Sequence, residues 1–321
     1  MRRPRSALVP SLRSGRATRR LLAALLLAAP TAGAQTGDPP TTIPYPTRCG
    51  TAIPDDEARG YVPLPRGDVF CPLVADPKGI RSFVSYLRET SEEAETSVGS
   101  VGIGDDFAFL RWSGPRPGDG LQLALSGSVF AQFDLDTHSY DLLNADFLIG
   151  LPVTWRRDGT SARFRVYHQS SHLGDEFLLR GEHPERENLS FEAIELLLSQ
   201  DAGPLRVYGG GELVVNRDPE DLAPAIAHGG AELRPRATVT FGRLASARFL
   251  LATDVKASRD QDWKPAWSTR AGFDFGRPRE GAFTGGRWSL LFEYYDGPSP
   301  YGQFYRNDVR LVGVGLHFLT R

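Results

Sequence analysis

From about residue 78 to the end of the chain, apolar and polar residues alternate in segments of about 10 to 15 residues that are separated by turn residues. In the segment 143–155 every second residue is apolar, whereas Asn144 and Asp146 lie on the other face. A period of two is typical of β-strands with one apolar face. The same alternation is present in 121–133, 247–257 and 267–275.

This pattern predicts twelve strands. These strands are long, with at least the ~9–11 residues that a tilted strand needs to cross a bilayer. The predicted strands lie near 79–89, 97–112, 120–134, 140–156, 161–173, 190–200, 204–217, 227–237, 246–258, 266–276, 287–297 and 308–320.

The connections between these strands alternate in character. The connections at 157–160 and 201–203 are tight, whereas that at 174–189 is long and polar. Short turns at one end and longer loops at the other are typical of outer-membrane barrels, and so are tryptophans near the ends of strands. We therefore predict an all-β fold over residues 78–321, an antiparallel up-and-down transmembrane β-barrel of about 12 strands. The tryptophans concerned are Trp112, Trp155, Trp267 and Trp288.

A soluble β-sandwich or a lipocalin-like barrel would also alternate, but it would bury its apolar face. A closed barrel of about twelve strands is too wide for small residues to fill, so its inner face has to be polar. Charged residues of both signs occupy the predicted inner positions. They predict either a lumen closed by its own ion pairs or a narrow water-filled path. These residues are Arg163, Arg165, Arg206, Glu212, Arg234, Asp254, Lys256, Arg270, Asp274 and Glu293.

Residues 1–34 have the composition of a signal peptide. Seven arginines precede the apolar run 21–29, and the sequence 32–34 (Ala-Gly-Ala) fits a cleavage site. The alternative is an N-terminal membrane anchor, for which the run is too short to cross as a helix. Export predicts an outer-membrane location. The expected partners are the barrel assembly machinery and outer-membrane lipid.

Removing the signal peptide changes the charge balance. The chain has 37 Lys+Arg and 39 Asp+Glu, so losing seven arginines leaves 30 basic against 39 acidic residues, a net charge of about −9. Nucleic acid is therefore excluded as a partner, because it requires a basic face. Residues 35–77 are rich in Pro and Gly and predict an irregular periplasmic segment. A disulfide between Cys49 and Cys71 is expected there, with a two-cysteine metal site as the alternative.

Three longer motifs resemble an uncharacterised family of exported bacterial proteins, the domain-of-unknown-function family numbered 1207. The resemblance covers roughly residues 70–318. It implies an outer-membrane-type barrel and no known activity. The motifs are Tyr167–Arg180 (YHQSSHLGDEFLLR), Tyr208–Gly211 (YGGG) and Glu293–Tyr305 (EYYDGPSPYGQFY).

One candidate active site lies at the end of the predicted strand 161–173. Strict alternation places His168 and Ser170, with His172, on the apolar, lipid-facing side of the wall. A histidine as general base and a serine as nucleophile are the minimum for acyl transfer. The next strand brings Glu192, or Asn188 just before it, to the same end as a group that could orient the histidine. A single β-bulge would turn this patch into the lumen.

The arrangement is similar to two families of outer-membrane hydrolases, phospholipase A and the lipid A deacylase, which carry His-x-Ser on an outward-facing strand with Asn or Glu on the adjacent strand. His168-x-Ser170 matches that core. Those families follow the serine with Asn and a small residue, whereas Ser171 and His172 follow here. The alternative is that these residues are hydrogen-bonding side chains that anchor the loop 173–189.

Two further groups of residues are candidates for binding. Asp175 and Glu176 begin a charged loop whose carboxylates could bind calcium, a possible cofactor; a solvated loop explains the same charges. The segment 293–305 is rich in aromatic and polar residues that could grip a sugar or another small ligand, or pack as a loop over the barrel mouth. Its candidate residues are Tyr294, Tyr295, Asp296, Tyr301, Gln303 and Tyr305.

Two functional classes therefore remain. One is an acyl hydrolase of outer-leaflet lipid with Ser170 as nucleophile and His168 as base. The other is a non-enzymatic barrel, either a narrow channel, a ligand-binding protein or a structural component. The side of the wall on which His168 and Ser170 lie separates these classes.

Overall fold

The computed structural model describes residues 60–92, 94–116, 118–180, 188–241, 245–279 and 282–319, all of which belong to the compact unit Thr42–Arg321. The predicted signal peptide 1–34 and Cys49 lie outside the described residues. Cys71 is disulfide-bonded.

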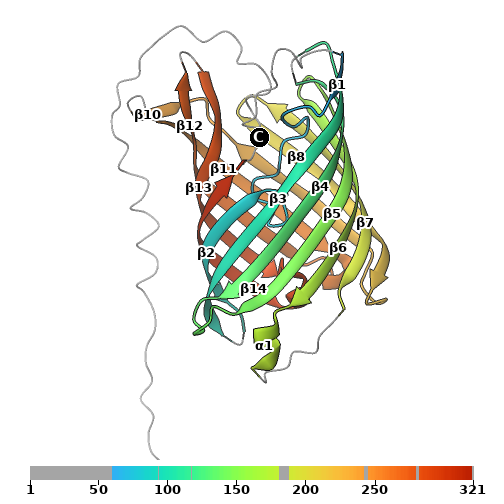
Figure 1. The fold of residues 1–321 in the computed structure, drawn as a ribbon, viewed down its shortest axis with the longest axis vertical. Coiled ribbons are helices and arrows are strands. Elements are labelled where there is room, and N and C mark those ends of the chain that lie inside the picture. The colour runs from blue at the N-terminus through green and yellow to red at the C-terminus, as the bar shows by residue number, and fades with distance from the viewer. Residues whose placement is uncertain are drawn as a thin grey trace, which may run out of the picture. The chain divides into compact units, whose positions relative to one another are not determined.

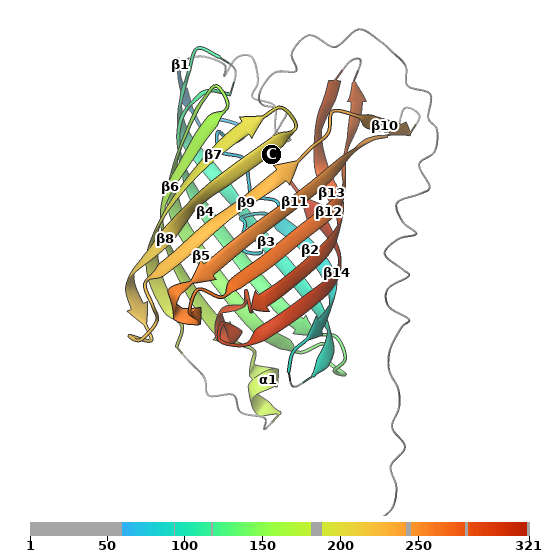
Figure 2. The same ribbon diagram turned by 180° about the vertical axis from the view of Figure 1, so that it is seen from behind.

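Twelve strands close into an antiparallel barrel, as predicted (Figures 1 and 2). Each strand pairs with the next along the chain, and β14 pairs with β2 to complete the ring. The twelve strands are β2 (Ser82–Thr90), β3 (Glu95–Ser113), β4 (Gly120–Asp134), β5 (Leu142–Arg157), β6 (Thr160–Leu173), β7 (Ser190–Ala202), β8 (Leu205–Asp218), β9 (Ala225–Leu233), β11 (Ala245–Ser258), β12 (Pro265–Arg279), β13 (Ala282–Pro298) and β14 (Asp308–Phe318).

Shorter elements complete the fold. Strand β1 (Gly60–Pro63) pairs with β3 and strand β10 (Thr238–Phe241) pairs with β11. One short helix, α1 (Asp175–Leu179), follows β6, and two 3-10 turns are Arg259–Gln261 and Gly302–Phe304. No helix in the described part of the chain is long and apolar enough to cross a membrane.

The alternation in the sequence becomes an apolar outer wall and a polar inner wall. In β5 the side chains of Phe147, Ile149 and Leu151 point outward and are about half exposed, whereas Asn144 and Asp146 are fully buried. Because a strand turns successive side chains to opposite faces, this arrangement follows from the pattern alone. Such a belt of exposed apolar side chains is characteristic of a wall that contacts lipid.

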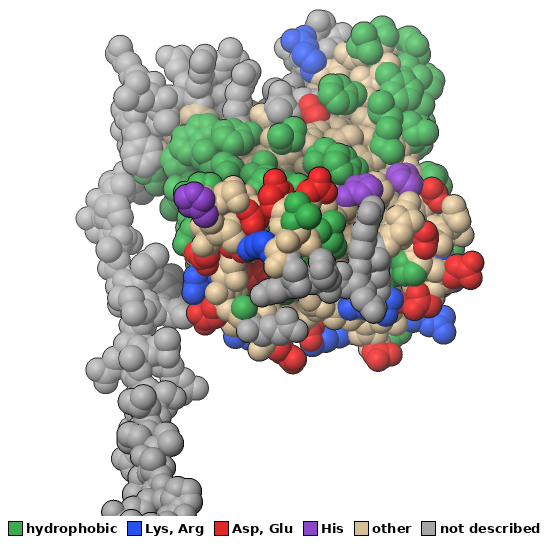
Figure 3. All heavy atoms as spheres, turned by 60° about the horizontal axis from the view of Figure 1, so that its bottom comes forward, with side chains coloured by type: hydrophobic (Ala, Val, Ile, Leu, Met, Phe, Trp, Pro, Cys, Tyr) green, Lys and Arg blue, Asp and Glu red, His purple; other side chains and the backbone are tan. Residues whose placement is uncertain are grey.

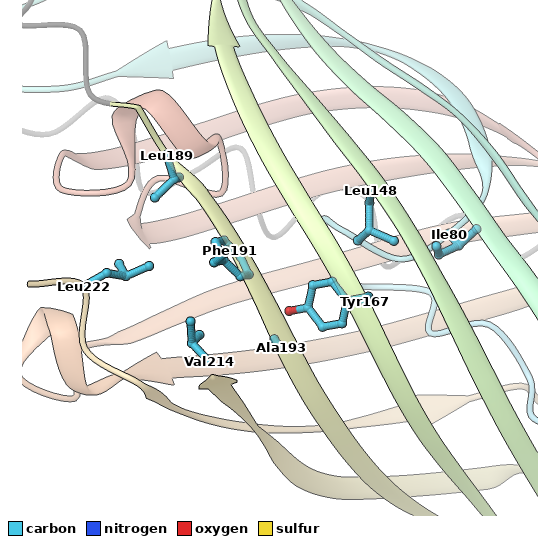
Figure 4. Close-up of a cluster of buried hydrophobic side chains, with 8 residues drawn as sticks. All are labelled: Ile80, Leu148, Tyr167, Leu189, Phe191, Ala193, Val214 and Leu222. Atoms are coloured by element: carbon cyan, nitrogen blue, oxygen red, sulfur yellow. The ribbon is translucent and has the colours of Figure 1, made fainter. Parts of the chain in front are cut away.

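The two ends of the barrel differ. We call the end with the β6–β7 and β13–β14 connections the loop end, and the opposite end the turn end. Figure 3 shows charged side chains gathered at the loop end, hydrophobic side chains on the wall beyond it, and histidines at the boundary between the two zones. Just inside the loop end, buried apolar side chains such as Leu148, Phe191 and Val214 pack around Tyr167 (Figure 4).

Residues 67–81, which we call the lumen segment, run inside the barrel. Phe70 and Leu73 are almost fully buried there. The Val74 backbone N–H donates to Glu232 Oε1 at 2.8 Å, and the Val74 carbonyl accepts from Arg270 Nη1 at 2.7 Å. The sequence predicted an irregular periplasmic segment for residues 35–77. It did not predict that the second part of this stretch lies inside the barrel.

Ion pairs occupy the space that the lumen segment leaves. Glu195 accepts from Arg163 Nε at 2.7 Å and from Arg165 Nη2 at 2.8 Å. Arg270 pairs with Glu293 at 2.8 Å. The mixed charges predicted for the inner wall therefore pair with one another. This arrangement is the first of the two predicted alternatives, a lumen closed by its own ion pairs.

Candidate functional site

The His-x-Ser motif lies on the outer wall at the loop end of β6. Along this strand Tyr167, Gln169 and Ser171 are buried in the lumen, whereas the residues between them face outward. The pairing of β6 with β5 and β7 is regular over this stretch, with no register shift. His168 and Ser170 therefore face the lipid side, as strict alternation predicts.

His168 is joined to Glu192 across the β6–β7 pair. The two residues are register partners, and His168 Nδ1 lies 2.8 Å from Glu192 Oε1. Both side chains are a little over one-third exposed. A carboxylate on Nδ1 fixes the ring orientation and leaves Nε2 available to act as a base, which is the arrangement of a catalytic histidine.

Ser170 follows His168 on the same face, one pleat nearer the loop end. It lies opposite Phe147 on β5 and Ser190 on β7. Among the hydrogen bonds of the described residues, none joins Ser170 Oγ to the His168 ring. The two side chains are ~7 Å apart along the strand, so rotation about their side-chain bonds decides whether they meet. Such contacts often tighten only when substrate is bound.

A third residue holds Glu192, and the sequence analysis missed it. Asn216 on β8 donates from Nδ2 to Glu192 Oε2 at 2.6 Å. A β-bulge makes this possible: Glu192 pairs with Asn216 and Ala193 pairs with Val214, so Val215 is the extra residue. Without the bulge Asn216 would point into the lumen. Bulges re-aim side chains in this way, and the sequence carries no signal for this one.

Asn188, the alternative orienting residue, has a different partner. Its Nδ2 donates to Asp218 Oδ2 at 2.6 Å, and this pair is exposed. Of the two residues proposed to orient His168, the structure joins only Glu192 to it.

A groove on the outer wall begins beside this site. Its volume is about 410 Å³, and it is lined by Ile194, Leu196 and Leu198 of β7 and Leu213 of β8. The run Gly209–Gly211 forms its floor because these residues carry no side chains. Ile194 follows Glu192 by two residues on the same face, ~7 Å farther from the loop end. We call this feature the outer-wall groove.

The calcium candidates lie apart from these residues. Asp175 and Glu176 occupy the first turn of α1 and are exposed. Neither belongs to a group of three or more potential metal ligands among the described residues. The groups that do exist are inside the lumen.

The aromatic segment 293–305 splits between the two faces of the wall. Tyr294 and Asp296 point outward, and their side chains hydrogen-bond to each other at 3.2 Å. Tyr295 and Tyr301 are buried, and the Tyr301 hydroxyl contacts Ser100. Burial raises the pKa of Tyr301, so its hydroxyl stays protonated.

The rest of this connection folds over the barrel mouth. Gln303 Nε2 donates to the Ser171 carbonyl at 2.8 Å, and the Gln303 N–H donates to Asn144 Oδ1 at 3.0 Å. Tyr305 lines a cavity of about 190 Å³ between this loop and the lumen segment. Tyr295 lines the same cavity, so the predicted ligand-binding residues are divided between the barrel mouth and the outer wall.

The sequence model of a family described as "Protein of unknown function (DUF1207)" matches residues 41–319 of this chain. No curated protein matches the chain. Among solved structures, the outer membrane phospholipase of Salmonella typhi, a dimer with bound calcium, superposes with a TM-score of 0.50 at 12% identity, over 75% of this chain and 91% of that one.

Two more solved structures match the chain. Outer membrane phospholipase A of Escherichia coli matches with a TM-score of 0.50 at 13% identity, over 75% of this chain and 90% of that one. The KdgM porin matches with a TM-score of 0.38 at 10% identity, over 74% of this chain and 99% of that one. At these identities the likeness to the phospholipases concerns the fold, that of an outer-membrane β-barrel.

Proposed function

Since this chain belongs to the DUF1207 family, whose description assigns no activity, we propose its function from its own side chains: hydrolysis of acyl esters in outer-leaflet lipid. The observation that carries the proposal is the hydrogen bond between His168 Nδ1 and Glu192, on the lipid-facing wall with Ser170 beside it. Structural likeness to outer membrane phospholipase A agrees with it at the level of fold.

In the proposed reaction the Ser170 hydroxyl attacks the ester carbonyl while His168 Nε2 takes the hydroxyl proton. The carbon–oxygen bond to the alcohol then breaks, and His168 returns the proton to the leaving alkoxide. Water, deprotonated by His168, then attacks the acyl-serine; the bond to the serine oxygen breaks, His168 returns the proton to that oxygen, and the fatty acid is released. Glu192 stabilises the imidazolium in each half-reaction.

The surroundings of the site fit a lipid substrate. We propose that the barrel spans the outer membrane, since its outer wall exposes apolar side chains, and that the barrel assembly machinery inserts it. Polar residues on that wall are tolerated near the edge of the bilayer, where the ester groups of lipids lie. The outer-wall groove extends from the site along the acyl-chain region, and we propose that it accepts one acyl chain of the substrate.

The test is release of fatty acid from phospholipid, and from lipopolysaccharide, by the refolded protein in detergent with calcium present. A serine-reactive sulfonyl fluoride should stop the reaction and label Ser170, which peptide mass spectrometry detects. Absence of fatty-acid release from both lipids would refute the proposed activity.

We expect Gly209→Leu to impair hydrolysis of long-chain esters by filling the groove. A Cβ at Gly209 would have open space, its nearest neighbour being the His228 carbonyl at 3.8 Å. Blocking an apolar subsite changes kcat/KM by roughly 10–200-fold. The loss should appear with long acyl chains and not with a short, soluble ester.

Gly127→Leu is the matched control. Gly127 lies on the outer wall at β4, and a Cβ there would have nothing within 4 Å. The added side chain is the same, but the site is several strands away. Equal losses in the two variants would show that the groove does not select the acyl chain.

A non-enzymatic, structural role is the second candidate. The filled lumen favours it, because the lumen segment and the ion pairs of Glu195 and Glu293 occupy the path that a wide channel would need. Lack of hydrolysis combined with lack of conductance in planar bilayers is the result that this role predicts.

A further inference from the structure

We infer that a divalent metal ion of the zinc class binds inside the barrel, where the lumen segment meets strands β8, β9 and β11. The site consists of Asp76, Glu212, His228 and Asp254, which we call the lumen cluster. One ligand atom each of Asp76, His228 and Asp254 lies within 4.8 Å of the others, and Glu212 and His228 belong to a second such group. All four side chains are buried.

His228 supplies evidence that the site takes a ligand. Its ring is fully buried, and its Nε2 lies 2.8 Å from Asp254 Oδ2. Its Nδ1 has no hydrogen-bond partner among the described residues and lies 3.9 Å from Glu212 Oε1, which forms an ion pair with Lys256 at 3.3 Å. A buried polar atom without a partner is unfavourable, so His228 Nδ1, which faces the Glu212 carboxylate, indicates a missing group.

The spacing between His228 and Glu212 suits one ion. Zinc binds histidine nitrogen at about 2.0–2.1 Å and carboxylate oxygen at about 2.0–2.2 Å, so two ligand atoms of the same ion are at most ~4.3 Å apart. The separation of 3.9 Å between His228 Nδ1 and Glu212 Oε1 is within this limit. A mixed nitrogen and oxygen donor set favours zinc and its transition-metal neighbours over magnesium or calcium.

The charge of the lumen cluster is also compatible with a bound cation. Asp76, Glu212 and Asp254 carry three negative charges, and Lys256, 3.3 Å from both Asp76 Oδ1 and Glu212 Oε1, supplies one positive charge. The three carboxylates therefore outnumber the one cation that pairs directly with them, and a divalent ion would supply further positive charge. The nearby Glu195 is excluded from the site because two arginines already hold it.

An ion can reach the cluster from the loop end. The cavity of about 190 Å³ beneath the β13–β14 loop is lined by Asp76, Glu212, Asp254 and Lys256. The Lys256 side chain is one-quarter exposed, so its ammonium group can turn toward the cavity when an ion enters. A route of entry is one requirement for a metal site.

The lumen cluster joins the lumen segment to the barrel wall. Asp76 belongs to that segment, whereas Glu212, His228 and Asp254 come from three strands of the wall. A bound ion would therefore fasten the segment to the wall by coordinate bonds.

The test is titration of the refolded protein, without a histidine tag, with zinc chloride by calorimetry and with cobalt chloride by visible absorption. We expect one ion per chain. We expect His228→Gln to weaken binding by at least about 100-fold, beyond the roughly 10–100-fold typical of changes around metal ligands.

His317→Gln is the matched control. His317 is also a buried lumen histidine, but its Nε2 lies 3.1 Å from Glu293, outside the lumen cluster. This variant should bind zinc as the wild type does. Failure of the wild type to bind one ion per chain, or equal binding by both variants, would overturn the inference.

X-ray absorption at the zinc edge of the wild-type protein does not depend on whether a variant folds. We expect one imidazole nitrogen with oxygen ligands around the ion. A spectrum with no imidazole, or with two or more, would assign the ion to another place on the chain and refute the lumen site.

Discussion

Replacing Ser170 with alanine should lower the rate of lipid ester hydrolysis by about 10³-fold or more, because the hydroxyl is the proposed nucleophile. His168→Ala should cause a loss of similar size, since neither group works without the other. The double variant should be no worse than either single variant. Fatty-acid release is the measurement, and the heat-modifiable shift in gel mobility reports that the barrel is folded.

The same wall offers matched controls. His172, two residues beyond Ser170, lies edge-on against Phe147 with ring centroids 5.7 Å apart. Ser190 lies opposite Ser170 on β7. His172→Ala and Ser190→Ala should stay within about threefold of the wild type, well inside the tenfold that ~1.4 kcal/mol represents. Activity that survives in Ser170→Ala would exclude this serine as the nucleophile.

Replacing Glu195 with alanine should destabilise the barrel by about 3–5 kcal/mol. The Glu195 carboxylate is fully buried and holds Arg163 and Arg165. Removing it leaves two buried guanidinium groups without their counter-ion. The measurement is the free energy of unfolding in urea, with the protein in detergent or lipid vesicles.

Glu95→Ala is the comparison for this effect. Glu95 pairs with Arg88 at 3.3 Å, but both side chains are about half exposed or more. Exposed ion pairs contribute ~0–1 kcal/mol, so this change should be nearly neutral. Similar destabilisation by the two variants would mean that Glu195 owes its effect to something other than its buried partners.

Periodicity made most of the barrel predictable. Strand β4 begins and ends at the predicted residues 120 and 134. The prediction was poorer where the pattern breaks. Strand β9 ends at Leu233 and not near 237, because Pro235 has no N–H to donate to a neighbouring strand.

The position of the lumen segment could not be predicted from periodicity. Its apolar residues follow no period, and its partners are far away in the chain: the bond between Val74 and Glu232 spans 158 residues. The candidate site was likewise predictable only in part. Alternation placed His168 and Ser170 on the outer wall, but Asn216 reaches Glu192 only through a bulge that the sequence does not reveal.

The position of the lumen segment also bears on how the barrel assembles. The segment leads directly into β2, and β2 forms the seam with β14, so the filling of the lumen and the closing of the wall involve neighbouring stretches of chain. Val74 bonds to Arg270, a residue of the late strand β12. The Val74 carbonyl thus lacks this partner until β12 is in place, and we expect ring closure and filling of the lumen to be one cooperative event. Contacts over such separations make folding slow.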